Sequence, residues 1–292
     1  MPMSMRVLPA PWLSEALRRP LAERPDGLVH SIFASAVNVS VGGRLLTIVE
    51  PAAGRLPWGL TVISGADFTA FGLRPGDRVE MTPARLRFVR TGLQVDLGPA
   101  RGWDPTIRKI DRPAPAERLS MAAELTPVGG LGRAADDPLR AWAAITSLRS
   151  AAGAMDGKLL DRASQTLIGR GPGLTPSGDD VLVGFNAAMA AADHPLARAA
   201  ALRIAVTARG RTTDVAQSYH DAAARGAYAE HLHDVIQALV AVDGDTLEPA
   251  IARMLAWGAT SGADTLLGIL LASDALAAMR GAVGAIGSRH AA

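Results

Sequence analysis

The sequence predicts an α+β protein, with an N-terminal small β-barrel or sandwich followed by an α-helical domain. Residues 27–101 carry short β-type runs separated by turn residues, and after about residue 115 the pattern becomes helical and rich in alanine. Between these regions, residues 103–117 contain Pro105, Pro113 and Pro115. Proline lacks a backbone donor and biases the residue before it away from helix, so this stretch predicts an extended linker.

These boundaries divide the chain into three parts: a lead-in over residues 1–26, a β-rich domain over 27–115 and an α-helical domain over 116–292. The β-type runs cover residues 30–41, 44–50, 59–65, 77–82, 85–90 and 93–98. Several short strands at this spacing are typical of a small barrel or sandwich.

Helices follow in the second domain. Asp136-Asp137-Pro138 predicts the start of a helix that continues to about Ala152, because acids favour a helix N-terminus and proline is tolerated in the first turn. Further helices are expected over residues 158–168, 177–192, 195–208, 213–225, 228–240, 247–256 and 261–279. Their alanine content favours all of them.

The composition limits the class of protein. Of the 292 residues, 49% are hydrophobic and 20% are charged, which fits a globular protein with a substantial core. The net charge is only +2, and the basic residues alternate with acids, so we expect no nucleic-acid partner. Cysteine is absent, which excludes disulfides and zinc–thiolate sites. No apolar run reaches the roughly 20 residues of a membrane span, so we expect a cytoplasmic protein without a membrane partner.

The stretch GPGLTPSGDD, at residues 171–180, is the strongest functional candidate. Gly171 and Gly173 precede an expected helix start, and Thr175 and Ser177 place hydroxyl groups beside it. A glycine-rich loop before a helix N-terminus can hold a phosphate or carboxylate. It is not a Walker motif, since no Gly-Lys-Ser/Thr follows.

Part of this motif recurs. SGDDVLVG begins at Ser177, and SGADTLLG begins 84 residues later at Ser261. In each copy a serine followed three residues later by an acid (Asp180, Asp264) resembles a helix capping box, which is a purely structural interpretation. Capping leaves Gly178 and Gly262 unexplained, because glycine is a poor helix former unless another backbone or a ligand comes close.

Gly184 and Gly268 fall on a similar face of the two expected helices. Our hypothesis is that the two helices pack together with converging N-termini. Such an arrangement would favour an anionic ligand.

Asp179 and Asp180 complicate an anion site, because carboxylates repel phosphate. Mg²⁺ could bridge them to the ligand, an amide NH₂ of the ligand could donate to them, or one Asp could serve only as a cap. The second alternative fits a ligand that carries both a carboxylate and an amide.

Thr212 or Thr213 is a natural helix N-cap, although Thr213 is also a candidate for the site. His220, His231 and His233 lack a clear metal-ligand spacing, so we expect no zinc site. No Gly-x-Ser-x-Gly elbow supports a hydrolase triad.

Three segments together resemble a known family: GPGLTPSGDDVLVG at 171–184, TTDVAQSYHDAAARGAYAE at 212–230 and GATSGADTLLG at 258–268. His-Ser-Ile-Phe at 30–33 and Gly-Trp-Asp-Pro at 102–105 extend the likeness to nearly the whole chain. The family is that of the AllH-type subunit of oxamate carbamoyltransferase. The resemblance implies a multi-subunit enzyme of allantoin (purine nitrogen) breakdown that interconverts carbamoyl phosphate plus oxamate with phosphate plus oxalurate.

Our leading hypothesis is therefore a carbamoyltransferase subunit that needs no cofactor, although Mg²⁺ could take part. Asp179 and Asp180 are the candidate catalytic residues. The candidate substrate-binding residues are Gly171, Gly173, Thr175, Ser177, Gly178, Thr213, Ser261, Gly262 and Asp264. Two alternatives stay open: a non-catalytic structural or regulatory subunit, and a Mg²⁺-dependent enzyme that uses Asp179, Asp180 and Asp264 on a small phosphorylated or carboxylated metabolite.

Overall fold

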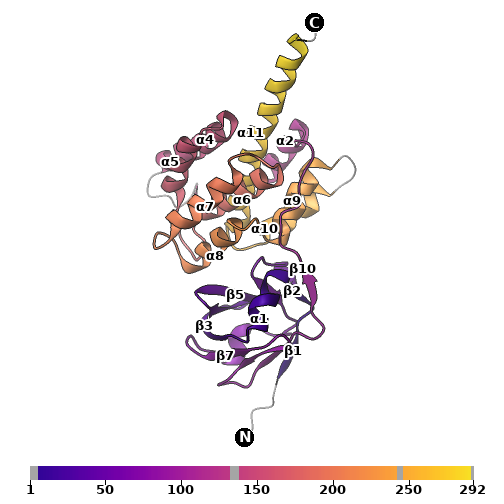
Figure 1. The fold of residues 1–292 in the computed structure, drawn as a ribbon, viewed down its shortest axis with the longest axis vertical. Helices are drawn as coiled ribbons and strands as arrows, with labels where there is room; N and C mark the ends of the chain where they lie inside the picture. The colour runs from indigo at the N-terminus through magenta and orange to yellow at the C-terminus, as the bar shows by residue number, and fades with distance from the viewer. Residues whose placement is uncertain (1–5, 132–137, 242–245, 291–292) are drawn as a thin grey trace. The chain divides into compact units, whose positions relative to one another are not determined.

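The computed structural model describes residues 6–131, 138–241 and 246–290, and its contacts divide the chain into two units, Met1–Pro105 and Thr106–Ala292 (Figure 1). The first unit is a curled sheet and the second is helical, so the predicted α+β class is confirmed. The division falls at Pro105 rather than near residue 115. The expected helix cap at Asp136 and Asp137 lies outside the described residues.

Within the described residues, ten strands form a single sheet in the order β1-β9-β8-β7-β3-β4-β5-β6-β2-β10. The central strands are those that the sequence predicts, although the first run divides in two at a short turn. They are β3 (Asp26–Ile32), β4 (Ala36–Val41), β5 (Arg44–Val49), β6 (Gly59–Thr61), β7 (Arg78–Met81), β8 (Arg85–Phe88) and β9 (Gln94–Asp96).

The lead-in belongs to this sheet. β1 (Val7–Pro9) pairs in parallel with β9, and β2 (Trp12–Ser14) pairs with β6 and with β10 (Arg101–Trp103). The short helix α1 (Arg18–Ala22) follows β2. Ser14 caps the 3₁₀ turn Glu15–Leu17, since its side chain accepts a hydrogen bond from the Ala16 N–H.

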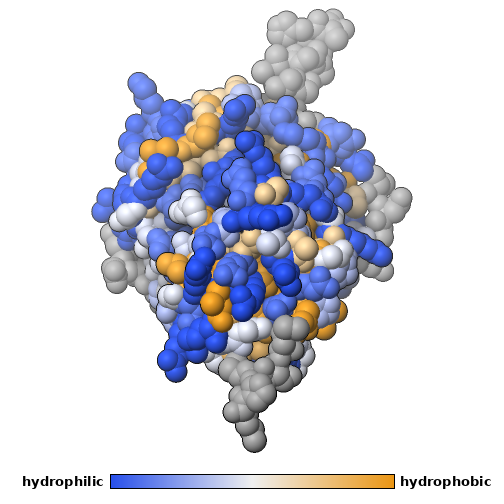
Figure 2. All heavy atoms as spheres, turned by 60° about the horizontal axis from the view of Figure 1, so that its bottom comes forward, coloured by the Kyte–Doolittle hydropathy of each residue, from blue (hydrophilic) through white to orange (hydrophobic). Residues whose placement is uncertain are grey.

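Glycines in the turns and the alternation of buried apolar residues along the strands explain why this sheet forms. Gly42 and Gly43 both have positive φ, as the two-residue turn of the β4–β5 hairpin requires. Val37, Val39 and Val41 alternate along β4 and are buried in the core of the unit. On the face shown in Figure 2, hydrophilic residues dominate and hydrophobic ones are scattered in small groups.

The second unit surrounds helix α6 (Ser177–Ala191), which is buried along almost its whole length and lies in the middle of the helical bundle (Figure 1). The other helices are α2 (Ala116–Leu125), α4 (Pro138–Ala154), α5 (Gly157–Leu167), α7 (Ala197–Ala208), α8 (Asp214–Ala223), α9 (Glu230–Val240), α10 (Leu247–Leu255) and α11 (Ser261–His290). The most extensive packing in the unit joins α6 to α11.

One helix within the described residues is long and apolar enough to cross a membrane by length and composition: Ser261–Met279 of α11. Of its most apolar stretch, 56% is buried inside the protein, against α6, α4, α2 and α10. This is the burial expected of a core helix.

Residues 107–115, which include Pro113 and Pro115, form neither helix nor strand and hydrogen-bond to the helical unit. Ile107 N–H donates to the carbonyl of Gly226, and Ile110 N–H donates to that of Ala191, both at 2.9 Å. The segment is thus a packed part of the second unit rather than a free linker.

Candidate functional site

Helices α6 and α11 cross in direct backbone contact. A Cβ atom on Gly184 would overlap the carbonyl oxygen of Thr265, and one on Gly268 would overlap that of Val181. The two contacts are equivalent, because Val181 and Gly184 hold the positions in the first copy of the motif that Thr265 and Gly268 hold in the second. The repeat in the sequence is therefore a repeated contact in the structure, and only glycine permits it.

Gly178 and Gly262 form a second equivalent pair. A Cβ atom on Gly178 would overlap the carbonyl oxygen of Leu167 at the end of α5, and one on Gly262 would overlap that of Met254 in α10. Each copy is thus a helix–loop–helix pair, α5–α6 or α10–α11. The close neighbour that explains these glycines is another backbone.

The backbone N–H groups of the same two glycines are engaged. Gly178 donates to the carbonyl of Arg170 at 2.8 Å, and Gly262 donates to that of Trp257 at 3.0 Å. An anion held at the helix N-termini would therefore need donors other than these two N–H groups.

The two helix N-termini converge, as we expected. Thr175 Oγ1 lies 2.8 Å from Ser261 Oγ, although one residue precedes α6 and the other begins α11. Ser177 hydrogen-bonds to the carboxyl of Asp264, and Ser261 hydrogen-bonds to that of Asp180. Each serine thus pairs with the acid of the other copy.

This exchange corrects the capping-box interpretation of the first copy. Pro176 is the residue at the N-cap of α6, no side chain caps that helix, and Ser177 is already its first residue. The hydroxyl of Ser177 points across to Asp264 because the crossing at the glycines brings the second helix within reach.

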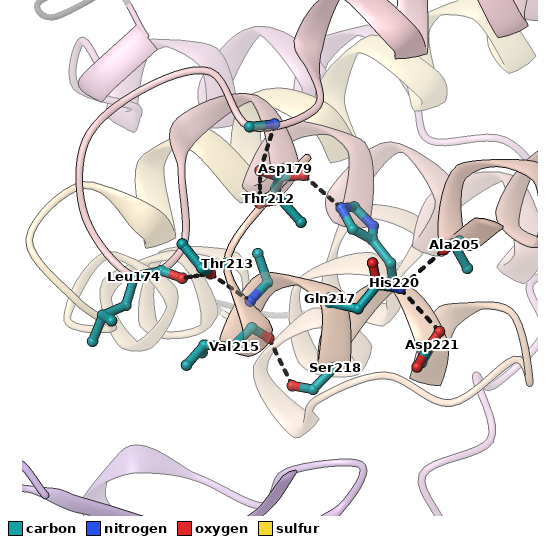
Figure 3. Close-up of polar contacts among 12 residues, drawn as sticks. Leu174, Asp179, Ala205, Thr212, Thr213, Val215, Gln217, Ser218, His220 and Asp221 are labelled. Atoms are coloured by element: carbon teal, nitrogen blue, oxygen red, sulfur yellow. Dashed lines mark hydrogen bonds and ion pairs between the residues drawn. The ribbon is translucent and has the colours of Figure 1, made fainter. Parts of the chain in front are cut away.

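Asp179 is the centre of a buried structural network (Figure 3). Its Oδ2 accepts hydrogen bonds from Gly169 N–H at 2.9 Å and from Thr212 Oγ1 at 2.7 Å. Its Oδ1 lies 2.7 Å from Nε2 of His220, which is fully buried on α8. The carboxyl thus joins the glycine-rich loop, the start of α8 and the body of α8, and the partners already cover both oxygens.

Thr213 has the structural role that the sequence offered as its alternative. Its hydroxyl caps α8 by accepting from Ala216 N–H at 3.1 Å, and it donates to the carbonyl of Leu174 in the glycine-rich loop (Figure 3). In the same loop, Gly171 and Gly173 have φ values of 107° and 93°, which favour glycine. These residues shape the loop.

Asp180 differs from its neighbour. It is only 4% exposed, and the hydroxyls of Ser261 and Thr175 hydrogen-bond to it. Among the described residues, its Oδ2 has no hydrogen-bond partner. Burial, helped by the charges of Asp264 and Asp179, raises the pKa of Asp180 well above its usual range.

Asp264, the counterpart in α11, is fully paired. It accepts from Gly130 N–H at 3.0 Å and from Leu131 N–H at 3.3 Å, in addition to the hydroxyls of Ser177 and Thr260. Burial raises its pKa, while these donors oppose the shift.

Aromatic side chains lie near Asp180. Burial and the charge of Asp180 raise the pKa of Tyr219 on α8. The Tyr219 ring meets the Trp257 ring edge-on, with centroids 5.6 Å apart, and the centroid of the His231 ring lies 4.3 Å from that of Trp257. Burial lowers the pKa of His231 to about 3, so its ring is neutral at pH 7.

Within the described residues, no three or more His, Asp or Glu side chains are grouped so that they could hold a metal ion. The three acids of the motifs instead have separate partners. Asp179 has a backbone N–H, the Thr212 hydroxyl and His220, Asp180 has hydroxyls, and Asp264 has backbone N–H groups and hydroxyls.

Sequence reasoning found the acids and hydroxyls but missed several of their partners. His220 was considered only as a metal ligand, and Tyr219, Trp257 and the Gly130–Leu131 backbone were not considered. A signal for His220 exists, since it lies seven residues, about two helical turns, after the α8 cap Thr213 and so falls on the same side of α8 as the cap. Nothing in the local sequence connects Gly130 with Asp264.

The fold and the site define a class: an α+β protein whose helical unit contains two equivalent helix–loop–helix pairs, with paired serines and acids where they cross. Comparison of the sequence with models of known protein families identifies the family. Residues 6–102 match the AllH family N-terminal domain, and residues 167–273 match the oxamate carbamoyltransferase subunit AllH. Together the two matches cover most of the chain, which belongs to the AllH family. No solved structure matches it.

Proposed function

We propose that this chain takes part in carbamoyl transfer between carbamoyl phosphate and oxamate, with its ligand site where α6 and α11 begin. The family description supports a carbamoyltransferase subunit. The observation that carries the location is Asp180, a buried carboxyl with one oxygen unpartnered among the described residues. Unpaired buried polar atoms are uncommon in folded proteins, and a ligand contact is one explanation for such an atom.

The reaction balances without a cofactor. The nitrogen lone pair of oxamate attacks the carbamoyl carbon, the bond from that carbon to the phosphate oxygen breaks, and the electron pair stays on phosphate. A proton passes from the attacking nitrogen to phosphate, which gives oxalurate. Such a step needs chiefly positioning and stabilisation of developing charge.

We assign the ligand contact to Asp180 and not to Asp179. Both oxygens of Asp179 already have partners inside the protein. Asp180 has one oxygen without a partner among the described residues, so it can take a further hydrogen bond from a ligand.

Other subunits are part of the proposal. The N–H groups of Gly178 and Gly262 are engaged, so the phosphate and carboxylate ends of the ligands need other donors. Partner subunits of the transferase are a natural source. We further propose a cytoplasmic enzyme of purine nitrogen breakdown, without a nucleic-acid or membrane partner.

Thermal shifts of the purified chain and of the co-expressed assembly test this proposal and its two rivals. Carbamoyl phosphate, oxamate, phosphate and Mg²⁺ are added separately. We expect oxamate or carbamoyl phosphate to stabilise the assembly without Mg²⁺, and Asp180→Leu to reduce the shift. A shift that Asp180→Leu leaves unchanged would support the non-catalytic role, which the use of the glycines in helix packing favours. A shift that requires Mg²⁺ would support the metal-dependent alternative.

A further inference from the structure

The two equivalent acids at the crossing of α6 and α11 differ in their backbone hydrogen-bond donors. Asp264 accepts two backbone N–H groups, from Gly130 at 3.0 Å and from Leu131 at 3.3 Å. The hydrogen bonds to Asp180 come from side chains, Ser261 and Thr175, and among the described residues its Oδ2 has no partner.

The rest of the surroundings match. Each acid receives one hydroxyl from the opposite copy, Ser261 for Asp180 and Ser177 for Asp264. Each also receives one hydroxyl from the loop before its own helix, Thr175 or Thr260. Among the hydrogen-bond donors to the two carboxyls, the difference is therefore confined to the backbone amides.

The segment that donates to Asp264 contains two glycines, Gly129 and Gly130, where it contacts the carboxyl and the hydroxyl of Ser177. A Cβ atom on Gly129 would overlap the Asp264 carboxyl, and one on Gly130 would overlap the hydroxyl of Ser177. Asp264 is thus contacted by a small planar amide, the peptide group of Gly130, which presents its N–H to the carboxyl.

From this internal pair we infer that Asp180 binds the amide end of the ligand, with a ligand N–H donating to Oδ2 as Gly130 N–H donates to Asp264. The ligand class is a small primary amide or carbamoyl compound. The inference rests on the proposed function and adds to it which end of the ligand this chain recognises. The neighbouring acids Asp179 and Asp264 favour the same orientation, because they would repel an anionic end.

A pair of stable, equally shaped ligands tests this. Oxamate and pyruvate differ only in an amide NH₂ in place of a methyl group. We expect isothermal titration of the assembled transferase to give about tenfold tighter binding of oxamate, which corresponds to one hydrogen bond to a buried polar group. In Asp180→Leu, which keeps the side-chain shape, and in Asp180→Ala, the two ligands are expected to bind within about twofold of each other.

Asp193→Leu is the matched control, because Asp193 is an exposed acid just beyond the other end of α6. It is expected to keep the preference for oxamate. Equal binding of the two ligands by the unsubstituted assembly, or a preference that survives in both Asp180 variants, would overturn the inference. A transfer assay on the same unsubstituted assembly distinguishes failure of this inference from failure of the proposed function. Carbamoyl transfer together with equal binding of oxamate and pyruvate refutes the inference alone. Absence of transfer refutes the proposed function as well.

Discussion

Asp179 and Asp180 are adjacent and both are buried, yet their oxygens are used in opposite ways. The three donors around Asp179 come from the loop and from α8, whereas Asp180 keeps one oxygen unpartnered among the described residues. A residue that serves stability is expected to be fully paired, and one retained for a ligand is not.

Asparagine at these two positions should therefore have different effects on stability. Asp179→Asn places an NH₂ group against the donors that now contact the carboxyl, among them Thr212 and His220. Since removing one partner of a buried charge-assisted contact is costly, the free energy of unfolding is expected to fall by about 3 kcal/mol. Asp180→Asn is expected to leave it unchanged or to raise it. Denaturant unfolding of the two variants measures the difference, and equal losses would refute the division of roles.

His231 should make the fold sensitive to acid. Its pKa is about 3 in the folded protein and near 6.5 in the unfolded chain, so between these values only the unfolded chain binds the proton. Stability is thus lost as the pH falls from about 6.5 towards 3. His231→Phe keeps a ring against Trp257 and removes the titrating group. Melting temperatures from pH 7 to pH 4 should fall less in this variant, and parallel curves would contradict the assignment.

At the scale of elements, the crossing of α6 and α11 decides the geometry of the site. The glycines bring the helix backbones into contact, and this contact places Ser177 and Ser261 opposite each other's acids. The site therefore depends on residues that contact no ligand.

Adding one methyl group at the crossing should be costly. Gly268→Ala is expected to lower the free energy of unfolding by at least about 2 kcal/mol, because its Cβ would overlap backbone atoms that cannot rotate away. Gly153→Ala is the control, since an added Cβ there meets nothing within 4 Å and alanine favours helix by up to about 1 kcal/mol. Chemical denaturation compares them, and a neutral Gly268→Ala would show that the helices do not cross as described.

Most of the strands and helices could be predicted from the sequence, and three short strands could not. The hydrophobic periodicity and turn residues were sufficient for the central strands and for the helices after Pro138, because these signals are local. Strands β1, β2 and β10 escaped prediction, since each has only three residues and prolines flank or end two of them. Their strand character comes from pairing with distant residues.

The same limit applies to the site. Ser177 with Asp180 looks like a local cap, and the real partner, Asp264, lies in the other copy of the motif. The repeat itself was the clue that predicted convergence of the helices. It could not predict the exchange of partners or the amides of Gly130 and Leu131, because both depend on the tertiary contact.

For the whole molecule, the division at Pro105 separates two cores. The β unit has its own hydrophobic cluster, and the helical unit has its own around α6. Residues 106–292 expressed alone should therefore fold and show a cooperative thermal transition by circular dichroism. A fragment that is soluble but melts without cooperativity would show that the helical unit depends on the sheet.

We propose that Asp180 contacts the reacting ligand in a carbamoyltransferase of which this chain is a subunit. The most direct test is the steady-state rate of carbamoyl transfer by the assembled enzyme carrying Asp180→Leu. We predict a loss of about a hundredfold in kcat/KM with an unchanged melting temperature. Transfer at the unsubstituted rate by this variant would contradict the account.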